Sequence, residues 1–286
     1  MAERLPAVGR GGRVAAGVVA AAALLGGAAG LKAWRHHQFL QEDLLRRVEA
    51  VQPILANSPG CEDWLAGRMP LIVVVMGQSN AANHADTRVS RPPMAVLHDG
   101  RCVMAKAPLP GGTGTGGSLW SALNERLQGQ WRGRPIVWVV VAVEGTALED
   151  WIGDASPLRR LWERQIDATV ATGWPIAAVL WQQGEADAIN STAAQDYVRG
   201  MRRLRALTEA RGLPGPWWLA QSTYCPPAMG PAIRAAIQDL VDEPTNGFRA
   251  GPDTDRLQGA ARNGCHFSAD GVEQAATLWH QALTAR

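Results

Sequence analysis

Short, uninterrupted apolar segments separated by helical patterns most constrain the fold of this chain. Four segments are rich in Val, Ile and Trp and lack polar alternation: 71–76, 136–143, 176–181 and 217–220. Such segments are typical of strands buried on both faces of a parallel sheet. Helical spacing of apolar residues occurs over 119–127, 158–170, 192–211, 233–241 and 272–283. This alternation predicts right-handed βαβ units and a three-layer α/β/α sandwich with a parallel sheet.

The residues directly after the first three predicted strands are polar residues or glycine. GQSN at 77–80 follows the first strand, EGT at 144–146 the second, and QQGEAD at 182–187 the third. Open parallel sheets bind ligands beyond the carboxyl ends of their strands, so we expect these three segments to share one rim. That rim would carry a hydroxyl group, a glycine turn and a carboxamide–carboxylate pair.

Ser79 is the candidate nucleophile on this rim, and a serine needs a neighbouring base to lose its proton. We select His266, which lies in a turn before the last predicted helix, whereas the other five histidines flank the N-terminal segment, lie in loop-like sequence or fall within that helix. The backbone N–H groups of Ser79 and Gly145 and the side-chain amide of Gln183 are the expected oxyanion donors. Taken alone, GQSN is more typical of a serine in a tight turn. With Ala81 after it, the block also departs from the G-x-S-x-G elbow of α/β-hydrolases.

Four blocks, taken together and in order, resemble the SGNH/GDSL-like hydrolases of the sialate O-acetylesterase type. The blocks are MGQSNAAN, VEGTALEDW, LWQQGEADA and GCHFSADG. The resemblance implies a flavodoxin-like α/β/α fold over roughly residues 70–284 that needs no metal or other cofactor. It implies that Ser79 is the nucleophile, that His266 is the base, and that Gly145 and Gln183 line the oxyanion hole. The implied activity is removal of acetyl or other short acyl groups from a carbohydrate or another small ester.

One position departs from the family pattern, which often places Asp three residues before the histidine. This chain has Asn263 there, and a neutral amide can orient His266 but cannot stabilise its imidazolium by charge. Glu185 of the QGE block, to which part of the family assigns this role, is the first expectation for the orienting carboxylate, and Asn263 is the second. A glycan-binding protein without hydrolysis is the third. Acyl transfer to a sugar hydroxyl would use the same residues as hydrolysis.

Three further features are interpreted as structural. Asp187 and Asp270 lie near the blocks, and we expect them to be helix-capping or surface residues. The glycine-rich run 111–118 lacks the Lys of a phosphate-binding loop, and we expect a mobile wall of the substrate cleft there.

Residues 14–31 form an uncharged run preceded by three arginines, which predicts a membrane span or a signal peptide. A short basic tail most often stays in the cytoplasm, so we expect the rest of the chain to be exported and anchored by this segment. The predicted organisation is a signal-anchor or signal peptide over 1–35, an amphipathic helix and linker over 36–69, and the esterase domain over 70–286.

A net charge of +2 without a basic stripe argues against nucleic acid as a partner. The sequence is silent on oligomeric state.

Cysteine spacing gives a separate indication of compartment. The four cysteines form no C-x-x-C pair, which excludes zinc-ribbon and thioredoxin-type motifs. Export favours two disulfides over four thiols. Cys225 follows the fourth predicted strand and Cys265 adjoins His266, so a bridge between them would hold the loop that carries the base. Cys61 and Cys102 precede and follow the first strand and form the other predicted pair.

Overall fold

The computed structural model describes residues 35, 38–243 and 245–285 of two compact units, 1–43 and 44–286. The run 14–31, expected to be a signal or anchor, lies outside these residues. Within them, no helix combines the length and apolar character needed to cross a membrane. Residues 38–49 are helical, as their spacing predicts. In the second unit, Leu44 is buried and Val48 packs against the core.

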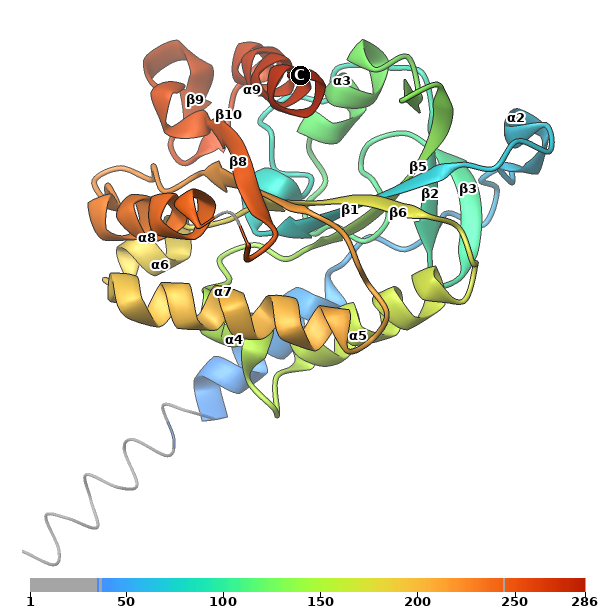
Figure 1. Cartoon of the computed structure of the whole chain (residues 1–286). Coiled ribbons are helices and arrows are strands. Elements are labelled where there is room, and N and C mark those ends of the chain that lie inside the picture. Colours follow the sequence, from blue (N-terminus) through green and yellow to red (C-terminus); the bar gives the residue numbers. More distant parts are fainter. Residues whose placement is uncertain (1–34, 36–37, 244, 286) are drawn as a thin grey trace, which may run out of the picture. The chain divides into compact units, whose positions relative to one another are not determined.

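A largely parallel sheet organises the second unit, in the strand order β3-β2-β5-β1-β6-β7-β8 (Figure 1). All neighbours along this order are parallel except the antiparallel pair β2 and β3, and β4 pairs antiparallel with β5. The strands are β1 (Leu71–Gly77), β2 (Met94–His98), β3 (Arg101–Ala105), β4 (Gln130–Trp131), β5 (Arg134–Ala142), β6 (Ile176–Gln182), β7 (Trp217–Gln221) and β8 (Phe248–Asp253). The four predicted strands are therefore β1, β5, β6 and β7.

Helices cover both faces of this sheet, which gives the predicted three layers. The helices are α2 (Glu62–Leu65), α3 (Leu119–Arg126), α4 (Leu148–Ile152), α5 (Pro157–Val170), α6 (Glu185–Ile189), α7 (Ala194–Glu209), α8 (Pro231–Asp242) and α9 (Ala269–Thr284). In Figure 1, α3 and α9 lie above the sheet, and α4, α5 and α7 lie below it. The three-layer α/β/α prediction is confirmed.

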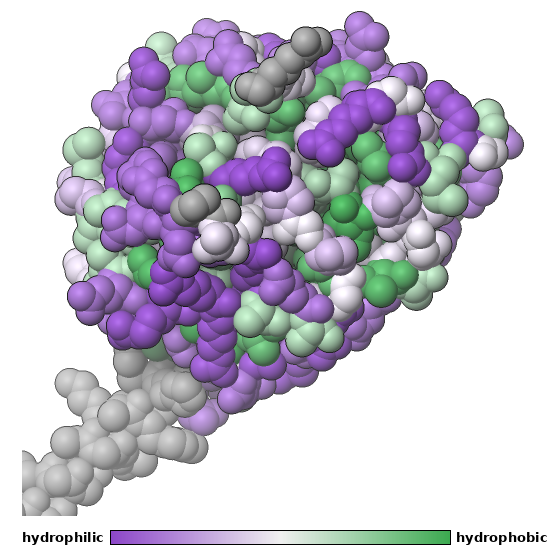
Figure 2. Space-filling view, in the orientation of Figure 1, coloured by the Kyte–Doolittle hydropathy of each residue, from purple (hydrophilic) through white to green (hydrophobic). Residues whose placement is uncertain are grey.

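Side chains of β1 alternate between two apolar cores. Val73 and Val75 join the core that contains α3 and α9, whereas Val74 and Met76 join the core with α4, α5, α7 and α8. Burial on both faces explains why β1 shows no polar alternation. Hydrophilic and hydrophobic residues are interspersed on the surface in Figure 2, with the hydrophobic ones in small patches.

The direction in which successive strands are added across the sheet reverses at β1. From β1 the chain continues to β2 and β5 on one side of the sheet and then crosses to β6, which pairs with the other edge of β1. In open parallel sheets, a ligand crevice forms beyond the strand ends at such a reversal. The carboxyl end of β1, where Gly77 leads into Ser79, is therefore the expected position of a site.

Both predicted disulfides are confirmed. Cys61 is bonded to Cys102 and Cys225 to Cys265. The first bridge joins the segment before β1 to β3. The second joins the segment after β7 to the residue before β10 (His266–Phe267), a two-residue strand that pairs with β9 (Arg262–Asn263). Two disulfides suit an extracellular or periplasmic protein.

Candidate active site

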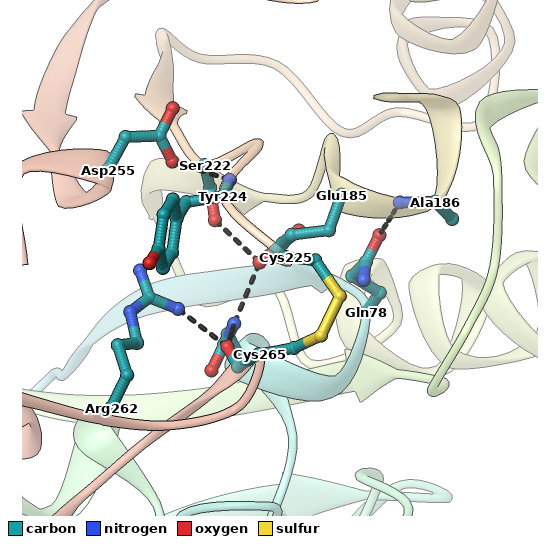
Figure 3. Close-up of a disulfide and its surroundings, with 10 residues drawn as sticks. Gln78, Glu185, Ala186, Ser222, Tyr224, Cys225, Asp255, Arg262 and Cys265 are labelled. Atoms are coloured by element: carbon teal, nitrogen blue, oxygen red, sulfur yellow. Dashed lines mark hydrogen bonds between the residues drawn. A yellow bond between two sulfur atoms is a disulfide. The ribbon is translucent and has the colours of Figure 1, made fainter. Parts of the chain in front are cut away.

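Ser79 begins a single turn of 3-10 helix, η1 (Ser79–Ala81), directly after β1. Gly77 has a φ of +154°, and a Cβ there would lie 2.2 Å from the carbonyl oxygen of Gln182 on β6, so only glycine fits this close approach. The side-chain oxygen of Gln78 accepts a hydrogen bond from the backbone N–H of Ala186 at 3.1 Å (Figure 3). The turn is thus tied to the start of α6, and Ser79 is 5% exposed.

His266 lies on β10, which is in contact with η1. The carbonyl oxygen of Phe267 accepts a hydrogen bond at 3.1 Å from the N–H of Asp86, in the loop after η1. Ser79 and His266 therefore come from neighbouring segments, although their side chains share no hydrogen bond in the part of the chain that the structure describes. Burial lowers the pKa of His266 from 6.5, with further lowering by His84 and Arg262 and an opposing effect of Glu144. The imidazole is therefore neutral at pH 7, as a base must be.

Glu185, the first residue of α6, is 1% exposed and shares no hydrogen bond with His266 among the described residues. Its Oε1 accepts hydrogen bonds from Asn80 Nδ2 at 2.7 Å and from Ser222 Oγ at 2.9 Å, the latter drawn in Figure 3. Burial raises the pKa of Glu185 to about 7. Asn80 and Ser222 thus occupy Oε1, whereas Oε2 is buried without a hydrogen-bond partner among the described residues, so the role of Glu185 as orienting carboxylate stays a prediction.

Asn263, the second candidate for orienting the base, stays a prediction in that role. It pairs with His266 through the backbone of the β9–β10 hairpin, but its side chain is exposed and makes no hydrogen bond to any described residue. The backbone pairing of the two strands, and not a side-chain interaction, therefore brings Asn263 opposite His266.

The expected oxyanion donors divide into two groups. The backbone N–H groups of Ser79 and Gly145 donate no hydrogen bond to other described residues, and Gly145 is exposed with a φ of +63°. The amide of Gln183, in contrast, is fully buried and donates both hydrogens, to the carbonyl oxygen of Thr146 at 3.1 Å and to Asp187 Oδ2 at 2.6 Å. The Gln183 side chain therefore offers no donor to the rim in this structure.

Asp187 caps a helix, which is one of the two roles expected for it, and it is buried. It accepts hydrogen bonds from Gln183, from Thr192 Oγ1 at 2.8 Å and from the backbone N–H of Leu148 at 2.8 Å. Leu148 is the first residue of α4, so Asp187 caps that neighbouring helix and not its own. Asp270 is exposed in the first turn of α9, as expected.

The glycine-rich run 111–118 is not a free wall of a cleft. Its backbone exchanges hydrogen bonds with Ala142 at the end of β5 and with Asn83 and Ala85 after η1. These hydrogen bonds hold the loop against the end of β5 and against the segment after η1, and its mobility stays a prediction.

Sequence analysis missed several residues around the site. Asn80 stands within the GQSN block and links Glu185 to the carbonyl oxygen of Cys265, which it reaches at 2.9 Å. Arg262 donates to the same carbonyl at 2.7 Å (Figure 3). Ser222 directly follows β7, so the rule that applied to the other strand ends would have selected it. No comparable signal marks Arg262.

A cavity of about 460 Å³ lies beside the Cys225–Cys265 bridge, outside the candidate site. It is lined by Tyr224, Met229, Arg234, Asp253 and Arg256, among others, and neither Ser79 nor His266 reaches it. Arg234 forms ion pairs there with Asp253 and with Asp255, whose carboxylate also accepts the N–H groups of Thr223 and Tyr224. Residues 251–255, with the sequence GPDTD, therefore contribute to the lining of this cavity and support the loop after β7.

The mostly parallel α/β/α sheet, with a serine at the end of its central strand, is the arrangement expected of SGNH/GDSL-like hydrolases. Similar solved structures agree on this fold. A protein from Arabidopsis thaliana is 22% identical over 76% of this chain and 99% of its own, with a TM-score of 0.60. A GDSL-like protein from Parabacteroides merdae is 14% identical over 77% and 98%, with a TM-score of 0.51. NanS is 16% identical over 76% and 97%, with a TM-score of 0.50.

The family of the chain follows from a direct match of its sequence. Residues 70–213 match the family described as carbohydrate esterase, sialic acid-specific acetylesterase. The chain belongs to this family and is a carboxylic ester hydrolase. A search of curated proteins found no match.

Proposed function

We propose that this protein removes short acyl groups, acetyl first, from a carbohydrate through an acyl-enzyme, with Ser79 as nucleophile and His266 as base. The observation that carries the proposal is the contact of η1 with β10 at the carboxyl end of β1. This contact brings the segment that carries Ser79 next to the segment that carries His266, in a chain of an acetylesterase family.

The reaction has two steps. Ser79 Oγ attacks the ester carbonyl carbon while His266 takes its proton, and the bond to the sugar oxygen then breaks as His266 returns that proton to the sugar. Water attacks the acetyl-Ser79 ester with His266 again as base, and acetate leaves as Ser79 regains its proton. The unused N–H groups of Ser79 and Gly145 would stabilise the negative charge on the carbonyl oxygen, each worth roughly 10²–10³ in rate.

Hydrolysis of p-nitrophenyl acetate and release of acetate from acetylated sugars test this proposal. We expect Ser79→Ala and His266→Ala to lower kcat by about 10³-fold or more. Equal rates for wild type and Ser79→Ala would reject the esterase assignment. Adding an unacetylated acceptor glycan separates the routes, because an acyltransferase would form a new acetylated sugar and a hydrolase would form acetate alone.

We further propose that the protein acts outside the cytoplasm, held by residues 14–31. The two disulfides support this location, since they persist in oxidising compartments. Fractionation of cells that express the full chain, with and without residues 1–35, tests the anchor. Equal recovery of both forms in the soluble cytoplasmic fraction would contradict it.

A further inference from the structure

The two residues expected to orient the candidate base share no hydrogen bond with its side chain among the described residues. Glu185 Oε1 accepts from Asn80 and Ser222, and the Asn263 side chain is exposed. A histidine that takes a proton in the rate-determining step still benefits from a nearby negative charge, because the imidazolium is otherwise formed in a partly buried position.

A second histidine occupies the space next to this base. The ring centroids of His84 and His266 lie 5.3 Å apart, with an angle of 34° between the ring planes. His84 Nε2 is 3.4 Å from Glu144 Oε2 and 3.0 Å from Thr113 Oγ1. Thr113 Oγ1 also accepts the backbone N–H of Glu144 at 3.0 Å, so one buried hydroxyl fixes both partners.

The position of His84 is built into the glycine-rich loop. A Cβ on Gly114 would lie 2.7 Å from His84 Nε2, so the imidazole packs directly on this backbone. Gly114 also has a φ of +85°, which side chains rarely adopt. A larger residue at position 114 would displace His84. A need for this imidazole in its present position is therefore one reason for a glycine there.

We propose that Glu144 is the carboxylate that stabilises protonated His266, and that His84 regulates how much of this charge the base experiences. Glu144 precedes Gly145 on the rim, and its side chain is 42% exposed, whereas that of His84 is 14% exposed. Since His266 is assigned as base only by the proposed function, this inference rests on it.

Charged groups around His266 shift its pKa in opposite directions. Glu144 raises the pKa of His266, while His84, when protonated, and Arg262 lower it. Burial lowers the pKa of His84 too, and Glu144 opposes that shift. Arg47 donates a hydrogen bond to the backbone carbonyl oxygen of Glu144 at 2.8 Å. Asp86 carries a further carboxylate and donates its backbone N–H to the carbonyl oxygen of Phe267, the residue after His266. The two histidines are expected to titrate as a coupled pair.

Two substitutions should shift the pKa of His266 in opposite directions. In Glu144→Gln the attraction for the imidazolium is lost, so we expect the pKa of His266 to fall by about half a unit or more. In His84→Gln the repulsion is lost while the Glu144 carboxylate stays, so we expect this pKa to rise. Glu144→Asp keeps the charge and should restore most of the wild-type value. Glu149→Gln, which removes an exposed carboxylate nearby on α4, is the matched control and should change nothing.

Titration of the histidine C2–H signals by NMR measures this pKa directly, with His266→Gln used to assign the signal. Performed on the Ser79→Ala protein, it does not depend on turnover, so a failed esterase assignment and a failed inference are distinguishable. In the active protein, the acid limb of kcat/KM should shift in the same directions. An unchanged or higher pKa in Glu144→Gln would overturn the role of Glu144, and an unchanged or lower pKa in His84→Gln would overturn that of His84.

Discussion

Asn80 Nδ2 lies 2.7 Å from Glu185 Oε1 and donates its second hydrogen to the carbonyl oxygen of Cys265, 2.9 Å away. Asn80 directly follows the candidate nucleophile, and Cys265 directly precedes the candidate base. One buried amide therefore links the turn after β1, the start of α6 and the hairpin that carries His266. Glu185 supports Asn80 in this arrangement through Oε1.

Replacement of Asn80 by Ala should uncouple the nucleophile turn from the base. The carbonyl of Cys265 would keep only the hydrogen bond from Arg262, and Glu185 would keep only that from Ser222. We expect the free energy of unfolding to fall by about 1–3 kcal/mol, the usual cost of a buried group left without its partner. We also expect kcat to fall by about tenfold or more, since small displacements of catalytic groups are costly. Urea denaturation and steady-state ester hydrolysis measure the two effects.

Asn263 offers the matched comparison and a test of its own. Its side chain is exposed and makes no hydrogen bond within the described residues, so Asn263→Ala should leave kcat and the free energy of unfolding close to wild type, within about 0.5 kcal/mol for stability. If this variant lost activity as Asn80→Ala is expected to, the amide of Asn263 would have to orient His266 during turnover. The same assays on both variants decide between these outcomes.

Much of the fold could be predicted because its parallel strands are buried on both faces. The uninterrupted segments predicted as strands correspond to β1, β5, β6 and β7, and the five long helical patterns correspond to helices within a few residues. The hairpin of β2 and β3 was missed, although Asp99 and Gly100 between them both have positive φ, as type I′ turns require. β8 was missed because FRAGPD contains Gly and Pro, which sheet-edge strands tolerate.

The candidate site was predictable in its positions but not in its contacts. Segments after β1, β5 and β6 could be assigned to one rim because parallel strands end at one edge. Sequence order gives no information on which side chain meets which, and the network around Glu185 depends on Ser222, more than 30 residues away along the chain. His84 lies in loop-like sequence, and its position is seen only from its contacts with Thr113, Glu144 and Gly114 in the structure.

The two disulfides allow a comparison at constant loop length. Their sequence separations are 41 for Cys61–Cys102 and 40 for Cys225–Cys265, so loop-closure entropy predicts the same loss, about 4 kcal/mol, when either is removed. Only Cys265 adjoins His266. We therefore expect Cys225→Ser with Cys265→Ser to lower kcat under conditions where the protein stays folded, and Cys61→Ser with Cys102→Ser to lower stability alone.

Thermal unfolding and ester hydrolysis at low temperature measure these two quantities for each double variant. An equal fall of kcat in both would show that the second bridge has no particular effect on the base. A fall in neither, at comparable loss of stability, would show that Asn80 and Arg262 hold the hairpin sufficiently.

Glu185 should make stability depend on pH in a defined direction. Burial raises its pKa from 4.5 to about 7, so between these values the folded protein keeps a proton that the unfolded chain has lost. The stabilisation is complete below about pH 4.5 and is lost as pH rises through about 7, a change of roughly 3 kcal/mol from the size of the shift. Glu185→Gln cannot titrate, and its amide oxygen can still accept from Asn80. Relative to wild type, this variant should therefore gain stability from pH 5 to pH 8, because all other titrating groups contribute equally to both proteins. Urea denaturation at the two pH values measures the difference, and a difference that stays constant with pH would mean that Glu185 is already ionised in the folded protein at pH 5.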